Sequence, residues 1–139
     1  MNRCVYITDI MKKAGWNKKQ ISNFYKTHRP KKYCKDVLKY GFETEVTWSL
    51  DLEFILNIYA KLKRYDEVNI VNTNCHKVIF CGKEHTFQES IDYILNTLEK
   101  YLVEYFSLNE DYTAIKEETR IKVEDAYRML AEIIWLLWW

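Results

Sequence analysis

The clearest hydrophobic pattern lies in residues 47–65. Its apolar residues recur at steps of three and four, the period of a helix with one buried face. They are Trp48, Leu52, Ile55, Ile58, Tyr59 and Leu62. Asp51 precedes Phe54 by three residues and Ile55 by four, so we expect its carboxylate to point into the apolar stripe and to need a cation or several donors. We expect this helix to be central, buried between two C-terminal helices.

Three shorter helices are predicted before it. Residues 5–14 have their apolar positions on one side, and Gly15 would end that helix. Asn17 can cap a second helix, whose apolar side consists of Ile21, Phe24 and Tyr25. A third is expected within residues 30–41. The first two resemble a helix-turn-helix in outline, which would read DNA, or they form a hairpin with a solvated lysine face.

The C-terminal half begins with a predicted β-hairpin that turns at Gly82 and Lys83. Thr86 and Glu89 have the spacing of a capping box, which would open a helix reaching about residue 106. Alternation along this hairpin would place Cys81 on one face, and His76 and His85 on the other. The helix after it has one apolar stripe: Phe87, Ile91, Ile94, Leu98, Leu102 and Tyr105.

A last helix is predicted from about residue 112 to the end. Its apolar stripe is Ile115, Thr119, Val123, Ala126, Leu130, Ile133 and Leu137. Trp135, Trp138 and Trp139 do not lie on that stripe, so the final two turns are apolar all round. A second surface must cover them. It is either the basic N-terminal helices or a second copy of the chain, which would make the protein a homo-oligomer.

These patterns predict a mainly α fold, a compact bundle of five or six helices with one short β-hairpin. The small numbers of Gly (3) and Pro (1) agree with long helices. The 139 residues are expected to form one domain, residues 1–139, with a basic helical segment 1–40 and a core segment 41–139. We expect no signal peptide, and the apolar run 133–139 is too short to span a bilayer.

Charge is divided along the chain. Residues 1–40 contain eleven Lys or Arg and two acidic residues, a sum of +9, so the remainder sums to −8 for a total of +1. Such a basic segment either folds back on the acidic part or faces an anion. The four cysteines, Cys4, Cys34, Cys75 and Cys81, form no CxxC pair, and we interpret them as reduced, in a cytosolic setting.

Two clusters have the residue types of a catalytic or metal site. Cys75, His76, Cys81 and His85 include every ligand type for zinc, but they match no common zinc spacing and the hairpin would separate them, so no metal is assigned. The acidic group consists of Glu43, Glu45, Asp51 and Glu53 and is a candidate acid/base or magnesium site. In the other interpretation the three glutamates are solvated and attract the basic segment, and Asp51 is a structural carboxylate near a helix N-terminus. Its partner would then be Arg29, because Arg64 is expected on the far face of the same helix. No catalytic residue is assigned, and three glycines exclude a glycine-rich phosphate loop.

A third cluster combines cations with aromatic rings. Arginine and lysine bind phosphates, and a nucleobase stacks on a flat ring. The predicted ligand-binding residues are Arg29, Lys31, Lys32, Tyr33, Trp48 and Asp51, where Asp51 would orient Arg29 or accept a hydrogen bond from the ligand. The other interpretation of these lysines is a solvated face.

Residues 28–63 carry a resemblance. A Gly-Phe and acidic loop precedes a Trp-Ser-Leu-Asp motif, and an apolar helix then ends in Leu-Lys; the matching residues are Gly41, Phe42, Glu45, Trp48, Ser49, Leu50, Asp51, Leu62 and Lys63. The block resembles a group of small, mostly uncharacterised bacteriophage proteins, as does the ending Leu-Leu-Trp-Trp. The first 27 residues depart from the group. The resemblance implies an accessory protein in the cytoplasm of the infected bacterial host, of a kind that often counters host defence.

Residues and resemblance together predict a non-catalytic phage accessory protein, without a cofactor, that binds and sequesters a phosphate-bearing nucleotide, such as a host defence signal. The alternative is a DNA-binding or host-protein-binding phage regulator that uses the basic N-terminal hairpin. A third hypothesis is a small hydrolase or metal enzyme that uses the acidic or the Cys/His cluster. No membrane partner is expected.

Overall fold

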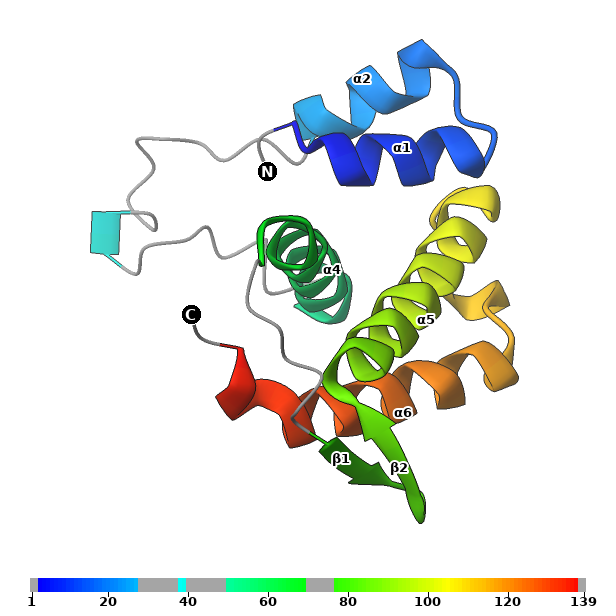
Figure 1. Ribbon diagram of the computed structural model, residues 1–139. Helices are drawn as coiled ribbons and strands as arrows, with labels where there is room; N and C mark the ends of the chain where they lie inside the picture. The colour runs from blue at the N-terminus through cyan, green and yellow to red at the C-terminus, as the bar shows by residue number, and fades with distance from the viewer. Residues whose placement is uncertain (1–2, 28–37, 40–49, 70–76, 138–139) are drawn as a thin grey trace.

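The computed structural model describes residues 3–27, 38–39, 50–69 and 77–137. Within these ranges the chain is mainly helical, with one two-stranded antiparallel hairpin, as the sequence predicted (Figure 1). Most of the third helix expected within residues 30–41 lies outside the described residues. The elements are α1 (Val5–Lys13), α2 (Lys18–Thr27), α4 (Leu50–Val68), β1 (Lys77–Phe80), β2 (Lys83–Thr86), α5 (Phe87–Ser107), η2 (Tyr112–Ala114), α6 (Glu117–Ile133) and η3 (Ile134–Leu136).

The helix at the centre of the fold is α5, not α4. In Figure 1, α5 crosses the molecule with α4 on one side, α6 along another and α1 near its C-terminal end. Its buried residues include the whole predicted stripe, and Leu98, Leu102 and Phe106 are at most 1% exposed. The expectation of a central α4 was wrong because α4 keeps one exposed face, at Asp51, Phe54, Asn57, Lys61, Arg64 and Glu67.

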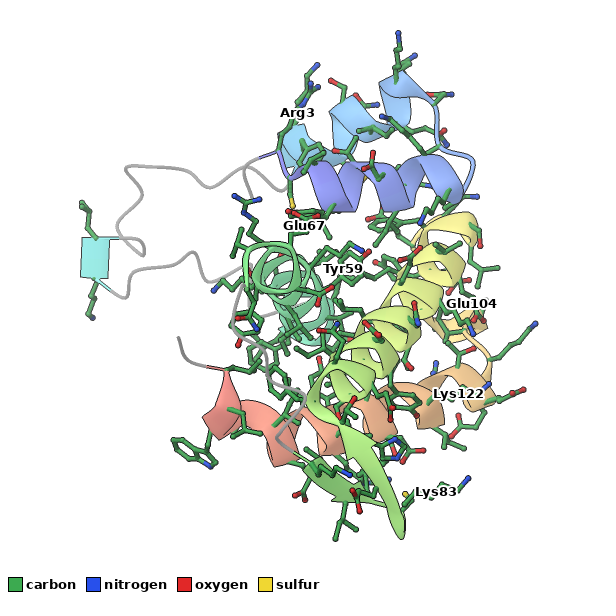
Figure 2. The ribbon with its side chains drawn as sticks, viewed as in Figure 1. Arg3, Tyr59, Glu67, Lys83, Glu104 and Lys122 are labelled. Atoms are coloured by element: carbon green, nitrogen blue, oxygen red, sulfur yellow. The ribbon has the colours of Figure 1, made fainter. Side chains whose placement is uncertain are left out.

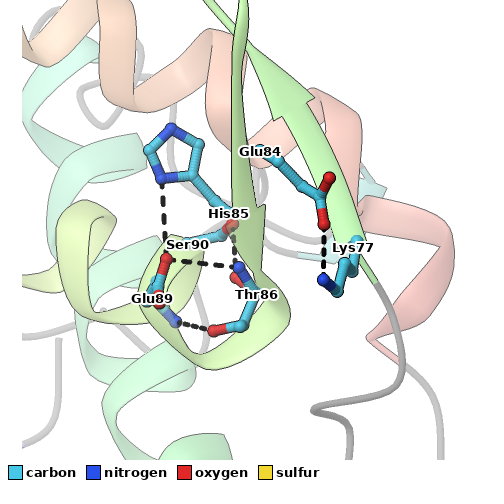
Figure 3. Close-up of polar contacts among 6 residues, drawn as sticks. All are labelled: Lys77, Glu84, His85, Thr86, Glu89 and Ser90. Carbon is cyan, nitrogen blue, oxygen red and sulfur yellow. Dashed lines mark hydrogen bonds and ion pairs between the residues drawn. The ribbon is translucent and has the colours of Figure 1, made fainter.

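The start of α5 is fixed by a capping box (Figure 3). Thr86 Oγ1 accepts a hydrogen bond from the Glu89 backbone N–H at 3.1 Å, and the Glu89 carboxylate accepts one from the Thr86 N–H at 3.3 Å. Ser90 is fully buried, and its hydroxyl donates to the Thr86 carbonyl. The prediction of this box from sequence is confirmed, because both partners are local to the helix terminus.

The β-hairpin turns one residue earlier than predicted. Phe80 pairs with Lys83, and Val78 pairs with His85, so the turn consists of Cys81 and Gly82. Both turn residues have positive φ, 52° and 73°, which a two-residue type I′ turn requires. Glycine adopts this conformation freely and takes the second turn position, which explains the shift in register.

The N-terminal helices form the predicted hairpin and pack onto α5. Gly15 ends α1 with a φ of +88°, and Asn17 and Gln20 exchange hydrogen bonds of 2.9 Å at the start of α2. The Trp16 indole donates to the Phe106 carbonyl at 2.6 Å, and the two rings meet edge to face at 5.1 Å. The apolar residues of α1 and α2 therefore belong to the same core as those of α5.

A polar contact links α1, α4 and α5. The Glu99 carboxylate of α5 accepts a hydrogen bond from Tyr59 of α4 at 3.1 Å and forms an ion pair with Lys13 of α1. Figure 2 shows Tyr59 between α4 and α5, where its side chain is 3% exposed. Glu99 thus joins three helices that are distant in sequence.

The last helix is shorter than predicted, because the α-helical pattern ends at Ile133 and η3 follows. Trp135 is 84% exposed, and Trp138 and Trp139 lie outside the described residues. The described N-terminal helices lie near the opposite end of α5 (Figure 1), so α1 and α2 do not cover Trp135. For Trp135 that alternative was wrong, and covering by a second copy stays a prediction.

Candidate functional site

The predicted ligand-binding residues fall in two groups. Asp51 lies in α4, and the others lie outside the described residues: Arg29, Lys31, Lys32, Tyr33 and Trp48. Asp51 is exposed, so the expectation of a carboxylate inside the apolar stripe was wrong. Leu52, the next residue, is 5% exposed, and each residue turns the helix by about 100°. Asp51 therefore lies at the edge of the stripe.

Asp51 lines a groove between α4, α5 and α6. The groove has a volume of about 480 Å³, within the range of about 300–1,000 Å³ typical of small-molecule sites. Its lining is aromatic and polar: Asp51, Phe54, Ile55, Tyr101, Tyr112, Arg120, Val123, Glu124 and Tyr127. We call these residues the Asp51 groove and treat it as the candidate binding site.

Three charged groups set the electrostatics of the Asp51 groove. The Arg120 guanidinium donates a hydrogen bond to the Tyr112 carbonyl at 2.8 Å, which holds this side chain in place. Asp51 is exposed, and it forms no hydrogen bond or ion pair with another described residue. Glu124, the second carboxylate of the lining, lies 3.9 Å from Arg128, and Arg120 also lies 4.0 Å from Glu117. Asp51 has no such ion pair with a described residue, which favours a ligand that brings N–H donors to this end of the groove.

Two tyrosines of the groove, Tyr101 and Tyr127, stay neutral at physiological pH. Burial raises the pKa of Tyr127 to about 12, and the charges of Tyr101 and Asp51 add to the effect. Burial, followed by the Asp51 charge, also raises the pKa of Tyr101. These phenols therefore keep their protons, so they offer flat rings for stacking and hydroxyls for hydrogen bonding.

The partner expected for Asp51, Arg29, lies outside the described residues, so that pairing stays a prediction. Arg64 of α4 lies 3.4 Å from Glu67. Sequence reasoning missed Arg120. The one signal for it was a stripe at helical spacing, Arg120, Val123, Glu124 and Tyr127, beside the core stripe of α6.

The Cys/His cluster is not assembled in the described part of the chain. Cys81 is an exposed turn residue, and the half-buried His85 lies 3.8 Å from Glu89 (Figure 3). Cys75 and His76 lie outside the described residues. Among the residues that the structure describes, no group of three or more His, Cys, Asp or Glu side chains is placed to hold a metal ion.

The described cations of the basic segment lie mainly on α1 and α2. Lys12 is 3.7 Å from Asp9, and Lys13 contacts Glu99. On α2, Lys19 and Lys26 are exposed and form no ion pair with another described residue. Part of the basic segment therefore folds back on acidic residues, and the exposed side of α2 keeps a positive charge.

No described helix is long and apolar enough to pass through a bilayer. Comparison of the chain with protein-family models, with curated proteins and with solved structures found no match.

Proposed function

We propose that this chain is a non-catalytic bacteriophage accessory protein that binds and sequesters a phosphate-bearing nucleotide, the chemical class of a host defence signal. The observation that carries the proposal is the Asp51 groove. It combines an exposed carboxylate, a guanidinium held by a hydrogen bond and tyrosine rings in a volume suited to a small molecule. The phage origin rests on the resemblance of residues 28–63.

The charge of the Asp51 groove suggests which part of the nucleotide it binds. A nucleobase brings ring and amino N–H groups, which the Asp51 carboxylate can accept, and a flat face, which tyrosines can stack on. The exposed Asp51 carboxylate would repel phosphates, so we assign the phosphates to Arg29, Lys31 and Lys32, and Tyr33 or Trp48 would add stacking. Trp48 precedes Asp51 by three residues, so this stacking residue is close in sequence to the groove.

Two measurements test this function. Native mass spectrometry of protein purified without denaturation should show a nucleotide-sized adduct, and calorimetry with a panel of linear and cyclic nucleotides should give affinities. We expect Asp51→Asn to weaken binding by about 10- to 100-fold, because a charged hydrogen bond contributes roughly 1.5–3 kcal/mol. Arg29→Ala should also weaken nucleotide binding, because it removes a guanidinium that we assign to the phosphates.

Glu53→Gln is the matched control. It removes the same charge from the first turn of α4, and Glu53 does not line the groove. If Asp51→Asn and Glu53→Gln bind nucleotide equally well, the groove is not the base site. If the wild-type protein carries no adduct and binds no nucleotide in the panel, the proposed function is wrong.

A second candidate is DNA binding by the N-terminal hairpin. It is supported by α2, whose exposed positions Lys19, Asn23 and Lys26 recur at helical spacing after a glycine turn, as in a recognition helix. The affinity for a labelled duplex would then fall steeply with salt, by about 0.9 log units per log salt for each phosphate contact. Lys19→Ala with Lys26→Ala should reduce that slope, and Lys83→Ala, at the far hairpin (Figure 2), should not.

A further inference from the structure

The Asp51 groove is built from one face of each of two helices. On α4, Asp51 and Phe54 are three residues apart, and on α6, Arg120 and Tyr127 are seven residues apart. Residues at these spacings lie on the same side of a helix. Tyr101 of α5 completes the lining between them. The groove therefore has a carboxylate from α4 and a guanidinium from α6.

These two charges act on the same phenol. Burial is the main cause that raises the pKa of Tyr101; the Asp51 charge raises this pKa further, and the Arg120 charge lowers it. The Tyr101 hydroxyl is therefore within range of both charges, which places an acceptor and a donor in one part of the groove. Arg120 donates to the Tyr112 carbonyl and lies 4.0 Å from Glu117, and a guanidinium has five N–H donors, more than these contacts use.

Two aromatic rings of the groove are exposed. Phe54 of α4 is 54% exposed, and Tyr112 of η2 is 62% exposed. Every nucleobase has a flat π face that stacks on such a ring, so stacking adds affinity without selecting a base. The selection among bases therefore depends on the polar groups, Asp51 and Arg120.

The hydrogen-bonding edges of the bases differ in what they offer to a carboxylate. Guanine presents N1–H and its 2-amino group side by side, and a carboxylate accepts such a pair with its two oxygens. Adenine and cytosine place one amino group beside a ring nitrogen that accepts, and uracil places one N–H between two carbonyl oxygens. With each of these three bases, a lone pair faces the second carboxylate oxygen, which is repulsive.

The position beside the donors distinguishes the purines again. Guanine has the acceptor O6 there, and arginine is a common donor to this atom. Adenine has an amino group in its place, which a guanidinium repels because neither group accepts a hydrogen bond. Asp51 and Arg120 therefore match the order of donors and acceptor on guanine.

We propose that the Asp51 groove selects guanine, with Asp51 accepting from N1–H and the 2-amino group and Arg120 donating to O6. This inference rests on the proposed function, because it takes the groove as the base site, and it names the ligand class as guanine nucleotides. The phosphates are the same for every base, so ligands that differ only in the base isolate the contribution of the groove.

Calorimetry with mononucleotides and cyclic dinucleotides of each base tests the selection. We expect guanine to bind about 10- to 100-fold more tightly than adenine, cytosine or uracil, because it makes one more hydrogen bond to a charged group. Inosine monophosphate keeps N1–H and O6 but lacks the 2-amino group. It should bind about 10-fold more weakly than guanosine monophosphate.

Asp51→Asn identifies the residue that reads the base. The asparagine amide has one acceptor oxygen and one donor group, which match N1–H and the 2-carbonyl of xanthine. Xanthosine monophosphate should therefore replace guanosine monophosphate as the preferred ligand of this variant. Glu53→Gln removes a carboxylate from the same turn outside the groove, and it should keep the preference for guanine. Unchanged circular dichroism shows that both variants are folded.

The outcomes separate this inference from the proposed function. Equal affinity for all bases, or a preference for another base, overturns guanine selection and leaves nucleotide sequestration standing. A guanine preference that Asp51→Asn leaves intact also overturns it, because another residue then reads the base. A wild type that binds none of these nucleotides overturns the proposed function, and guanine selection with it.

Discussion

The contact between Glu99, Lys13 and Tyr59 predicts how stability depends on pH. Replacing Glu99 by Gln keeps the size of the side chain and removes its charge. Two interactions weaken in the variant. Lys13 loses an ion pair whose side chains are 59% and 26% exposed, and Tyr59 then donates to a neutral amide oxygen in place of a carboxylate.

The size of the effect follows from the exposure of the two contacts. A largely exposed ion pair contributes about 0.2–1 kcal/mol. A hydrogen bond to a charged group exceeds a neutral one by about 1 kcal/mol, and the buried Tyr59 hydroxyl should realise most of that difference. We therefore expect Glu99→Gln to lower the free energy of unfolding by about 1–2 kcal/mol at pH 7.

The pH dependence has a definite sign. Burial would raise the pKa of Glu99, but hydrogen bonds from Lys13 and Tyr59 and the Lys13 charge outweigh it, and the pKa lies below its ordinary value of 4.5. A lowered pKa in the folded state adds stability above the unfolded value, and this stability is lost as the pH falls through the folded pKa. The wild type and Glu99→Gln should therefore differ at pH 7 and converge in acid.

Urea unfolding at a series of pH values measures the difference. Glu53→Gln is the control for general charge effects, because Glu53 lies on α4 and its carboxylate forms no hydrogen bond or ion pair with α1 or α5 in the described part of the chain. Equal stability of the wild type and Glu99→Gln at pH 7 would refute the account. A difference that persisted unchanged into strong acid would show that packing, not charge, causes it.

Three further predictions concern the turn, the helix cap and the tyrosines. Cys81→Asn should raise the free energy of unfolding by up to about 1 kcal/mol, because asparagine tolerates the φ of 52° better than cysteine does. An unchanged melting temperature would show that Cys81 causes no strain in the turn. Thr86→Ala should cost about 1 kcal/mol by removing the cap of α5, and Thr86→Ser should restore it. Burial raises the pKa of Tyr127 above the ordinary 10.0, to about 12, so its stabilising effect is present below pH 10 and is lost as the pH rises. The free energy of unfolding should therefore fall as the pH rises from about 10 to about 12, and it should fall less in Tyr127→Phe. Phenolate absorbance reports the ionisation during these measurements.

The helices were predictable because their signals are local. The stripe from Phe87 to Tyr105, the Thr86–Glu89 box and the Gly15 turn each depend on residues within a few positions of one another. The start of α6 shows the limit of such signals. Its N-cap, Lys116, provides no side-chain cap; Glu104 of α5 instead accepts hydrogen bonds from the Lys116 N–H and the Thr119 hydroxyl, at 2.9 and 2.6 Å (Figure 2). No spacing rule predicts a cap supplied by another helix.

The Asp51 groove escaped sequence reasoning for the same reason. Periodicity tells which side of a helix is apolar, but residues at the edge of a stripe face either the core or a neighbouring helix, depending on how the helices are rotated as they pack. Asp51 and Arg120 are both edge residues, one on α4 and one on α6, and only the packing of both helices on α5 brings them to one groove. A carboxylate buried in the core would have needed a cation or hydrogen-bond donors from the protein, whereas a carboxylate at the edge of a groove is hydrated by solvent. The rotation that made the burial prediction wrong is therefore what places Asp51 in the lining of the groove.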